Sequence, residues 1–166
     1  MASPEDPAAR LTELARAEPD RTALICPNTG QSISVAGLEE DSDLLARGLL
    51  ASGVGPGSRV ALFVPSGRDF LSLAFALLKI GAVAVVVDPS LSRRRLAESL
   101  DRIGPLTYVG GPSVQLGRLL PGRGRRGTRT SAAELRAAAA PVALPRPDPA
   151  GPAMVAICPG GTAALY

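Results

Sequence analysis

The spacing of hydrophobic positions changes twice in the middle of the chain. Val60–Val64 is a short, continuous apolar run, which is typical of a strand buried on both faces. From Phe70 to Leu78 apolar side chains recur at helical spacing, and Gly81 provides a stop. The chain is continuously apolar again at 82–87. This pattern predicts a strand, a helix and a second strand, with the two strands buried and parallel.

The same apolar stretch has a second interpretation, a membrane span. Residues 70–87 approach the length that a bilayer core requires. Lys79 and Gly81 oppose this interpretation, because a charge in the middle of a span is costly, whereas a helix that ends at Gly81 in an α/β unit needs no compensation. We therefore expect no membrane span.

Similar patterns predict elements on both sides of this unit. We expect helices at 7–17, 36–51, 91–103 and 131–140, and strands at 23–26, 31–35, 106–109 and 153–158. Pro27-Asn28-Thr29-Gly30 separates the first two strands, and Asn and Gly tolerate the positive φ of a tight turn. Because strands alternate with helices, the predicted fold class is α/β. We expect three layers, with a mainly parallel sheet, flanking helices and an N-terminal β-hairpin.

Length and composition set the domain organisation. At 166 residues the chain suffices for one core and is too short for two ordinary domains. We expect an N-terminal α/β subdomain at 1–110, a connection rich in Gly, Pro, Arg and Ala with a short helix at 111–152, and a terminal strand with a Gly-rich loop at 153–166. Gly110–Thr130 has no hydrophobic period, so we expect it to be poorly ordered.

Composition also removes several classes of chemistry. The chain has no histidine, which excludes Ser-His-Asp and Cys-His catalysis and removes the commonest metal ligand. Its two cysteines, Cys26 and Cys158, have no CxxC spacing, so neither a zinc site nor a disulfide framework is indicated. The first residues carry acidic side chains and no apolar core of a secretory signal, which favours a cytoplasmic protein.

The excess positive charge is local. The formal net charge is +3, and one Gly-containing stretch without acidic residues holds Arg118, Arg123, Arg125, Arg126 and Arg129. Such a stretch can contact phosphates or nucleic acid, or it can be a solvated linker. No aromatic or helical pattern organises these arginines into a binding surface, so we favour the linker and expect no nucleic-acid partner.

The segment after the last predicted strand is the candidate site. Pro159-Gly160-Gly161-Thr162 combines glycines with a hydroxyl, and glycine lets backbone N–H groups approach a phosphate closely. Gly160, Gly161 and Thr162 are therefore the candidate phosphate-binding residues. A plain turn has the same outline, and no lysine follows to contact a phosphate. The sequence indicates no catalytic residue and no metal ligand.

Several segments, in order, carry a resemblance to a known family. Gln31–Leu38 (QSISVAGL) is similar to the family's opening "itYaeL" segment. Val54–Val64 (VGPGSRVALFV) is similar to "GvkpGDrVall", and Leu77–Asp88 (LLKIGAVAVVVD) to "llkaGavyvpld". The chain thus resembles the N-terminal part of the AMP-forming acyl-adenylating enzymes, the acyl-CoA synthetase superfamily. Val87–Leu91, Tyr108–Pro112 and the arginine-rich stretch resemble its fatty-acyl ligase and olefin β-lactone synthetase branch.

This resemblance implies ATP-dependent activation of a carboxylate, with ATP and Mg²⁺ as cofactors. In the family, a Thr-Ser-Gly-Ser/Thr-Thr-Gly-x-Pro-Lys loop holds the β- and γ-phosphates of ATP. Here Gly160 and Thr162 match, whereas Pro159 removes an N–H donor and Tyr166 stands where the lysine is expected. The family's adenine site, ribose-binding aspartate, hinge and C-terminal lysine have no counterpart in these 166 residues.

These departures predict a truncated family member that does not catalyse the reaction alone. One hypothesis is a split enzyme, in which a separately encoded ligase fragment supplies the nucleotide and acyl sites. The other is a non-catalytic remnant that binds a protein partner, or a second copy of itself, through exposed strand edges and apolar helix faces. The acyl substrate is not predicted, because the family's acyl pocket lies largely beyond this segment.

Overall fold

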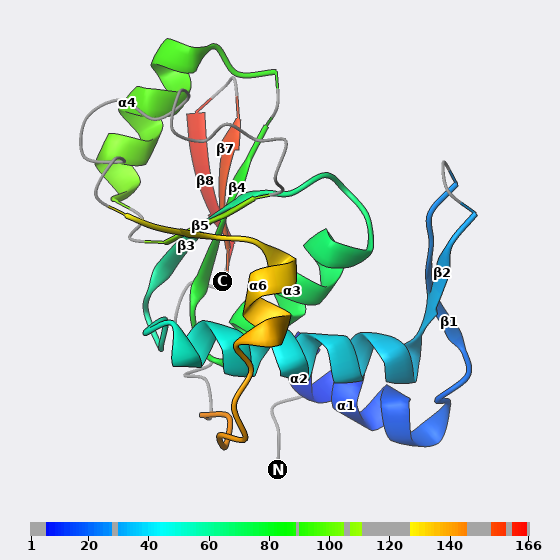
Figure 1. Ribbon diagram of the computed structural model, residues 1–166. Helices are drawn as coiled ribbons and strands as arrows, with labels where there is room; N and C mark the ends of the chain where they lie inside the picture. Colours follow the sequence, from blue (N-terminus) through cyan, green and yellow to red (C-terminus); the bar gives the residue numbers. More distant parts are fainter. Residues whose placement is uncertain are drawn as a thin grey trace.

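The computed structural model describes residues 6–27, 30–88, 90–104, 107–110, 127–145, 154–158 and 161–165, with the backbone alone for 158 and 161–165. Its helices are α1 (Pro7–Ala17), α2 (Val35–Ala51), α3 (Arg68–Lys79), α4 (Arg93–Ile103) and α6 (Ala132–Ala137) (Figure 1). Its strands are β1 (Thr22–Ile25), β2 (Ser32–Ser34), β3 (Arg59–Phe63), β4 (Val83–Val87), β5 (Thr107–Gly110), β6 (Thr128–Thr130), β7 (Met154–Cys158) and β8 (Gly161–Leu165).

The described strands form a six-stranded sheet in the order β6-β5-β3-β4-β7-β8 and a separate antiparallel hairpin, β1-β2. Neighbours in the large sheet are parallel except for β7 and β8. Within it, Val60 on β3 is paired with Ala84 on β4 and with Thr107 on β5. Helices connect β3 to β4 and β4 to β5, as parallel pairing requires. The predicted α/β class, with a mainly parallel sheet and an N-terminal hairpin, is confirmed.

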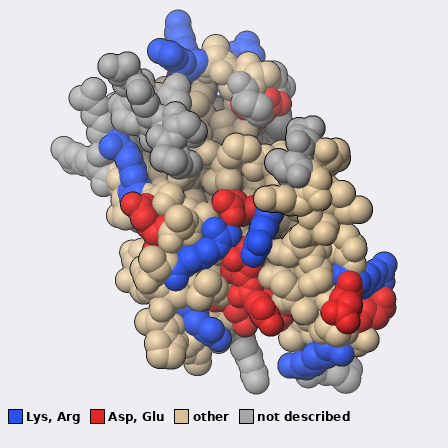
Figure 2. Space-filling view, turned by 45° about the vertical axis from the view of Figure 1, so that its right-hand side comes forward, with Lys and Arg blue, Asp and Glu red and all other residues tan. Residues whose placement is uncertain are grey.

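Helices cover both faces of the sheet, which gives three layers (Figure 1). Residues of α2, α3 and α6 share one apolar cluster with β3 and β4. On the opposite face, Leu96 and Leu100 of α4 pack with Ala61, Val85 and Tyr108 of the strands. On the face shown in Figure 2, acidic and basic side chains lie next to one another rather than in separate patches.

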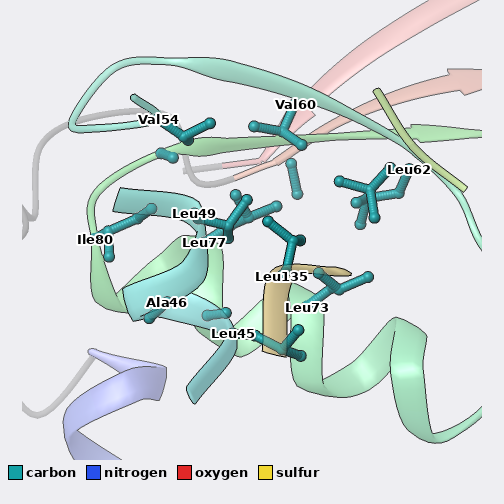
Figure 3. Close-up of a cluster of buried hydrophobic side chains, with 14 of the residues drawn as sticks. Leu45, Ala46, Leu49, Val54, Val60, Leu62, Leu73, Leu77, Ile80 and Leu135 are labelled. Carbon is teal, nitrogen blue, oxygen red and sulfur yellow. The ribbon is translucent and has the colours of Figure 1, made fainter. Parts of the chain in front are cut away.

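The larger core lies between the sheet and the layer of α2, α3 and α6. Its fully buried leucines are Leu45 and Leu49 of α2, Leu73 and Leu77 of α3, and Leu135 of α6. Figure 3 shows these side chains gathered beneath β3. Burial of each such side chain contributes about 1.5–3 kcal/mol. The apolar stripes predicted for the three helices are therefore the faces that hold this layer to the sheet.

Serine side chains set the start of three helices. Ser34 caps α2, Ser92 caps α4 and Ser131 caps α6, each by accepting a hydrogen bond from a backbone N–H of the first turn. The helix predicted at 91–103 therefore begins at Arg93, after its cap. The helix predicted at 131–140 is shorter, because α6 ends at Ala137.

The sequence pattern missed two strands, β6 and β8. β6 pairs with β5, with Thr128 opposite Thr107. The expectation of a poorly ordered stretch at Gly110–Thr130 is therefore wrong for Gly110 and for 127–130, while 111–126 lie outside the described residues. Three residues are too few to show a period, and β6 is stabilised by its pairing with β5.

Lys79, which opposed the membrane interpretation, is buried where α3 packs against α2. Its ammonium group donates hydrogen bonds to Glu39 at 2.7 Å and to Asp43 at 2.6 Å. Both carboxylates belong to α2, so the ion pairs join the two helices. Among the described residues, no helix is long and apolar enough to cross a bilayer.

Candidate functional site

The candidate site lies where the parallel strands of the sheet end. In open α/β sheets, ligands bind beyond the carboxyl ends of the strands. The carboxyl ends of β4 and β7 lie side by side, with Val87 opposite Ile157. The backbone N–H of Asp88 continues this pairing by donating to the Ile157 carbonyl at 3.0 Å. The segment predicted to bind phosphate therefore begins at the expected edge of the sheet.

Two of the three predicted phosphate-binding residues lie on β8. Gly161 is opposite Cys158 and Thr162 is opposite Ile157 in the antiparallel pairing of β8 with β7. Gly160 lies outside the described residues. β8 was not expected, and it gives Gly161 and Thr162 positions in a strand ladder rather than in an open loop.

The pairing of β7 with β8 determines how many backbone N–H groups of residues 159–162 lie in the connection between the strands. Because Cys158 is opposite Gly161, two residues, Pro159 and Gly160, connect the strands. Proline has no backbone N–H, so the connection itself offers one N–H donor, that of Gly160. Phosphate cradles use several successive N–H groups, and residues 159–166 contain no lysine. In this register the connection contains fewer N–H donors than an open Gly-rich loop, and phosphate binding by Gly160, Gly161 and Thr162 stays a prediction.

Asp88 is an acidic residue at this edge, directly after β4. Hydrogen bonds from the hydroxyl and the backbone N–H of Ser90 hold the pKa of Asp88 below its ordinary value. The hydrogen bond from the Ser90 backbone nitrogen to Asp88 Oδ1 is 2.8 Å long. Asp88 is therefore ionised at neutral pH. Among the described residues, no group of three or more His, Cys, Asp or Glu side chains is placed to hold a metal ion.

A network of ion pairs joins the three helices of the layer, α2, α3 and α6. Arg136 of α6 donates two hydrogen bonds to Asp41 of α2, at 2.8 and 2.9 Å, and one to Asp69 of α3 at 2.6 Å. Burial raises the pKa of Asp41, but the hydrogen bonds and charge of Arg136 outweigh it, so the pKa lies below its ordinary value. The two carboxylates raise the pKa of Arg136, chiefly through the hydrogen bonds of Asp41. Sequence analysis missed this network, because its members lie far apart in the chain.

The arginine-rich stretch is described in part. Arg129 lies on β6 and is exposed. Arg118, Arg123, Arg125 and Arg126 lie outside the described residues. The linker interpretation of this stretch stays a prediction.

Comparison of the sequence with known proteins matches residues 11–153 to the family described as "AMP-binding enzyme". The chain is 39% identical over 130 residues to an olefin beta-lactone synthetase from Stenotrophomonas maltophilia, and 40% identical over 122 residues to one from Xanthomonas campestris pv. campestris. These alignments cover 72% and 68% of this chain. They cover 24% and 22% of the relatives, so the chain spans about a quarter of the length of these curated relatives.

Solved structures have the same fold. A fatty acyl CoA synthetase from Mycobacterium tuberculosis gives a TM-score of 0.78 at 24% identity, over 95% of this chain and 33% of that chain. An O-succinylbenzoate Coenzyme A synthetase from Bacillus subtilis, solved in complex with ATP and magnesium ion, gives 0.71 at 20% identity, over 87% of this chain and 38% of that chain. These likenesses show the fold, and the match over residues 11–153 shows that the chain belongs to the AMP-binding enzyme family.

Proposed function

We propose that this chain is the N-terminal subdomain of an AMP-forming ligase that activates a carboxylic acid with ATP, in the branch of the olefin β-lactone synthetases and fatty-acyl ligases. The observation that carries the proposal is the match of residues 11–153 to the AMP-binding family, together with 39% and 40% identity to two olefin beta-lactone synthetases. A structural neighbour in complex with ATP and magnesium ion supports the cofactors of the family.

In this proposal the chain is a scaffold and is not catalytic alone. Its buried core and the ion pairs between α2, α3 and α6 make a rigid layer behind the carboxyl ends of the strands. The connection at Pro159 and Gly160 contains one N–H donor, fewer than the several successive donors of a phosphate cradle, and residues 159–166 contain no lysine. The nucleotide and acyl sites are therefore expected in parts of a complete enzyme other than this segment.

The first test uses the chain by itself. We expect no carboxylate-dependent exchange of pyrophosphate into ATP with short-, medium- or long-chain fatty acids. Exchange above the enzyme-free background with any of these acids would overturn the non-catalytic part of the proposal. It would leave the family assignment untouched.

The second test separates the scaffold from the loop with two matched chimeras of the Xanthomonas campestris relative. The first chimera carries residues 11–145 of this chain and keeps the relative's own loop. The second extends the replacement to residue 165 and so introduces Pro159 and Gly160. We expect β-lactone formation from the first chimera and not from the second. A folded but inactive first chimera contradicts the scaffold role, and an active second chimera contradicts the argument from the loop.

A split enzyme is the alternative, in which a partner chain completes the ligase. One feature favours it: Ile25 on β1 is 63% exposed, and among the described residues no further strand flanks the β1-β2 hairpin. Two-stranded hairpins are marginally stable in water by themselves, so such a hairpin is suited to pairing with another segment. Addition of the separately produced remainder of the relative would then restore activity, whereas no restoration favours the single-chain form.

A further inference from the structure

The outer edge of β1 is open for pairing with another strand. The backbone N–H of Cys26 donates to the Gln31 carbonyl, on the β2 side of the hairpin, at 2.8 Å. Because successive residues of an antiparallel strand direct their backbone groups to opposite sides, the N–H and the carbonyl of Ile25 point away from β2. Among the described residues no strand pairs with β1 on that side, and Ile25 is 63% exposed. The hairpin stands apart from the six-stranded sheet (Figure 1).

The composition of β1 leaves this edge unprotected. Its four residues, Thr22–Ile25, include neither a charged residue nor a proline. Folded proteins commonly block exposed edges with such residues, because an open row of N–H and C=O groups is a template for pairing with another chain. The irregularity in the pairing of β1 with β2 lies between Thr22 and Leu24, so the backbone at Ile25 is regular.

Two side chains of opposite charge lie at the two ends of β1. Asp20, just before the strand, is exposed and makes no ion pair with any other described residue. Arg68 lies near the other end, because it lines one pocket with Cys26. Arg68 approaches Asp41 at 3.5 Å, but both oxygens of Asp41 already accept hydrogen bonds from Arg136. The Arg68 side chain is 54% exposed, so it is available to a second carboxylate.

These features are complementary to a second copy of the same chain. Two identical antiparallel strands are related by a two-fold axis, which places the start of each strand beside the end of the other. Asp20 of one copy then lies on the side of Arg68 of the other copy, and the contact occurs twice. We propose that this chain forms a homodimer in which β1 pairs with β1 of the second copy and Asp20 of each copy pairs with Arg68 of the other. This inference concerns the hairpin edge and does not rest on the proposed function.

Charge reversal tests the proposed contact, with the dimer Kd of the full chain measured by sedimentation velocity over a series of concentrations. Asp20→Lys or Arg68→Glu alone brings like charges together at both contacts and should raise Kd by about tenfold. An equal mixture of the two variants offers opposite charges at both contacts of the mixed dimer, so it should associate as the unmodified chain does. This rescue separates a lost contact from a folding defect, because a misfolded variant would not recover on mixing.

Two further variants make the test specific. Arg94→Glu, which reverses an exposed charge on α4, is the matched control and should leave Kd unchanged. Ile25→Pro removes the outward N–H but not the hydrogen bond from Cys26 to Gln31, so it should abolish the dimer. The circular dichroism spectrum of each variant verifies that it is folded. A chain that is monomeric at every concentration, single charge variants that associate as the unmodified chain does, or a mixture that shows no recovery would overturn the proposal.

Discussion

Gly48 on α2 lies directly against the backbone of α6. A Cβ atom added at Gly48 would overlap the carbonyl oxygen of Leu135 and would lie 2.6 Å from its carbonyl carbon and 3.0 Å from its Cα. All three atoms belong to the backbone of α6, so no side-chain rotation can relieve the contact. Gly48→Ala must therefore push α6 away from α2.

The loss of stability caused by Gly48→Ala follows from the contacts that α6 loses when it moves away from α2. Leu135 is fully buried, and such burial contributes about 1.5–3 kcal/mol. The hydrogen bonds of Arg136 to Asp41 and Asp69 are stretched by the same movement. Alanine stabilises a helix interior by about 1 kcal/mol relative to glycine, which offsets part of this loss. We expect a net decrease of about 1–2 kcal/mol in the free energy of unfolding.

Urea denaturation followed by far-ultraviolet circular dichroism measures this change. The matched control is Gly55→Ala, because a Cβ at Gly55 meets no atom within 4 Å. That substitution should be neutral or stabilise by up to about 1 kcal/mol, since alanine restricts the unfolded chain. If Gly48→Ala is as stable as Gly55→Ala, the close packing of α6 on α2 is refuted.

Three further predictions concern the buried charges and the core. The lowered pKa of Asp41 means that its carboxylate stabilises the fold above about pH 4, and that this contribution is lost as the pH falls through the folded-state pKa. Asp41→Asn should therefore flatten the acid limb of a plot of unfolding free energy against pH, and an unchanged limb contradicts this. Lys79→Ala removes the cation that pairs with the half-buried Glu39 carboxylate, which keeps its hydrogen bond from Thr12, and should cost about 1–3 kcal/mol in urea denaturation, whereas a loss below about 1 kcal/mol shows that the pair is unimportant. Leu77→Ala should lower the free energy of unfolding by about 2–5 kcal/mol, but Leu44→Ala, at a position 37% exposed on α2, should cost much less, and equal losses would show that Leu77 is not in the core.

Hydrophobic spacing predicted most of the helices and strands because each of those elements buries a continuous stripe. The helix that includes Leu73 and Leu77 and the strands on either side of it follow from that spacing alone. β6 did not follow, because three residues of Thr and Arg carry no stripe and are held by pairing with β5. The contact at Gly48 did not follow from hydrophobic spacing either. A glycine inside a helical pattern indicates only a weaker helix, whereas its function here is to let a second backbone approach.

The candidate site shows why composition alone predicts a loop poorly. Pro159-Gly160-Gly161-Thr162 has the residue types of a phosphate loop, but the types do not say where strand pairing begins. The pairing of Gly161 with Cys158 shortens the connection to two residues, one of which is proline. If pairing began one or two residues later, the N–H of Gly161, and then that of Thr162, would belong to the connection. In the present register β8 pairs with β7 alone, and every second N–H of β8 points away from β7. Register therefore controls which N–H groups lie in the connection, and register is set by contacts between strands that hydrophobic spacing does not encode.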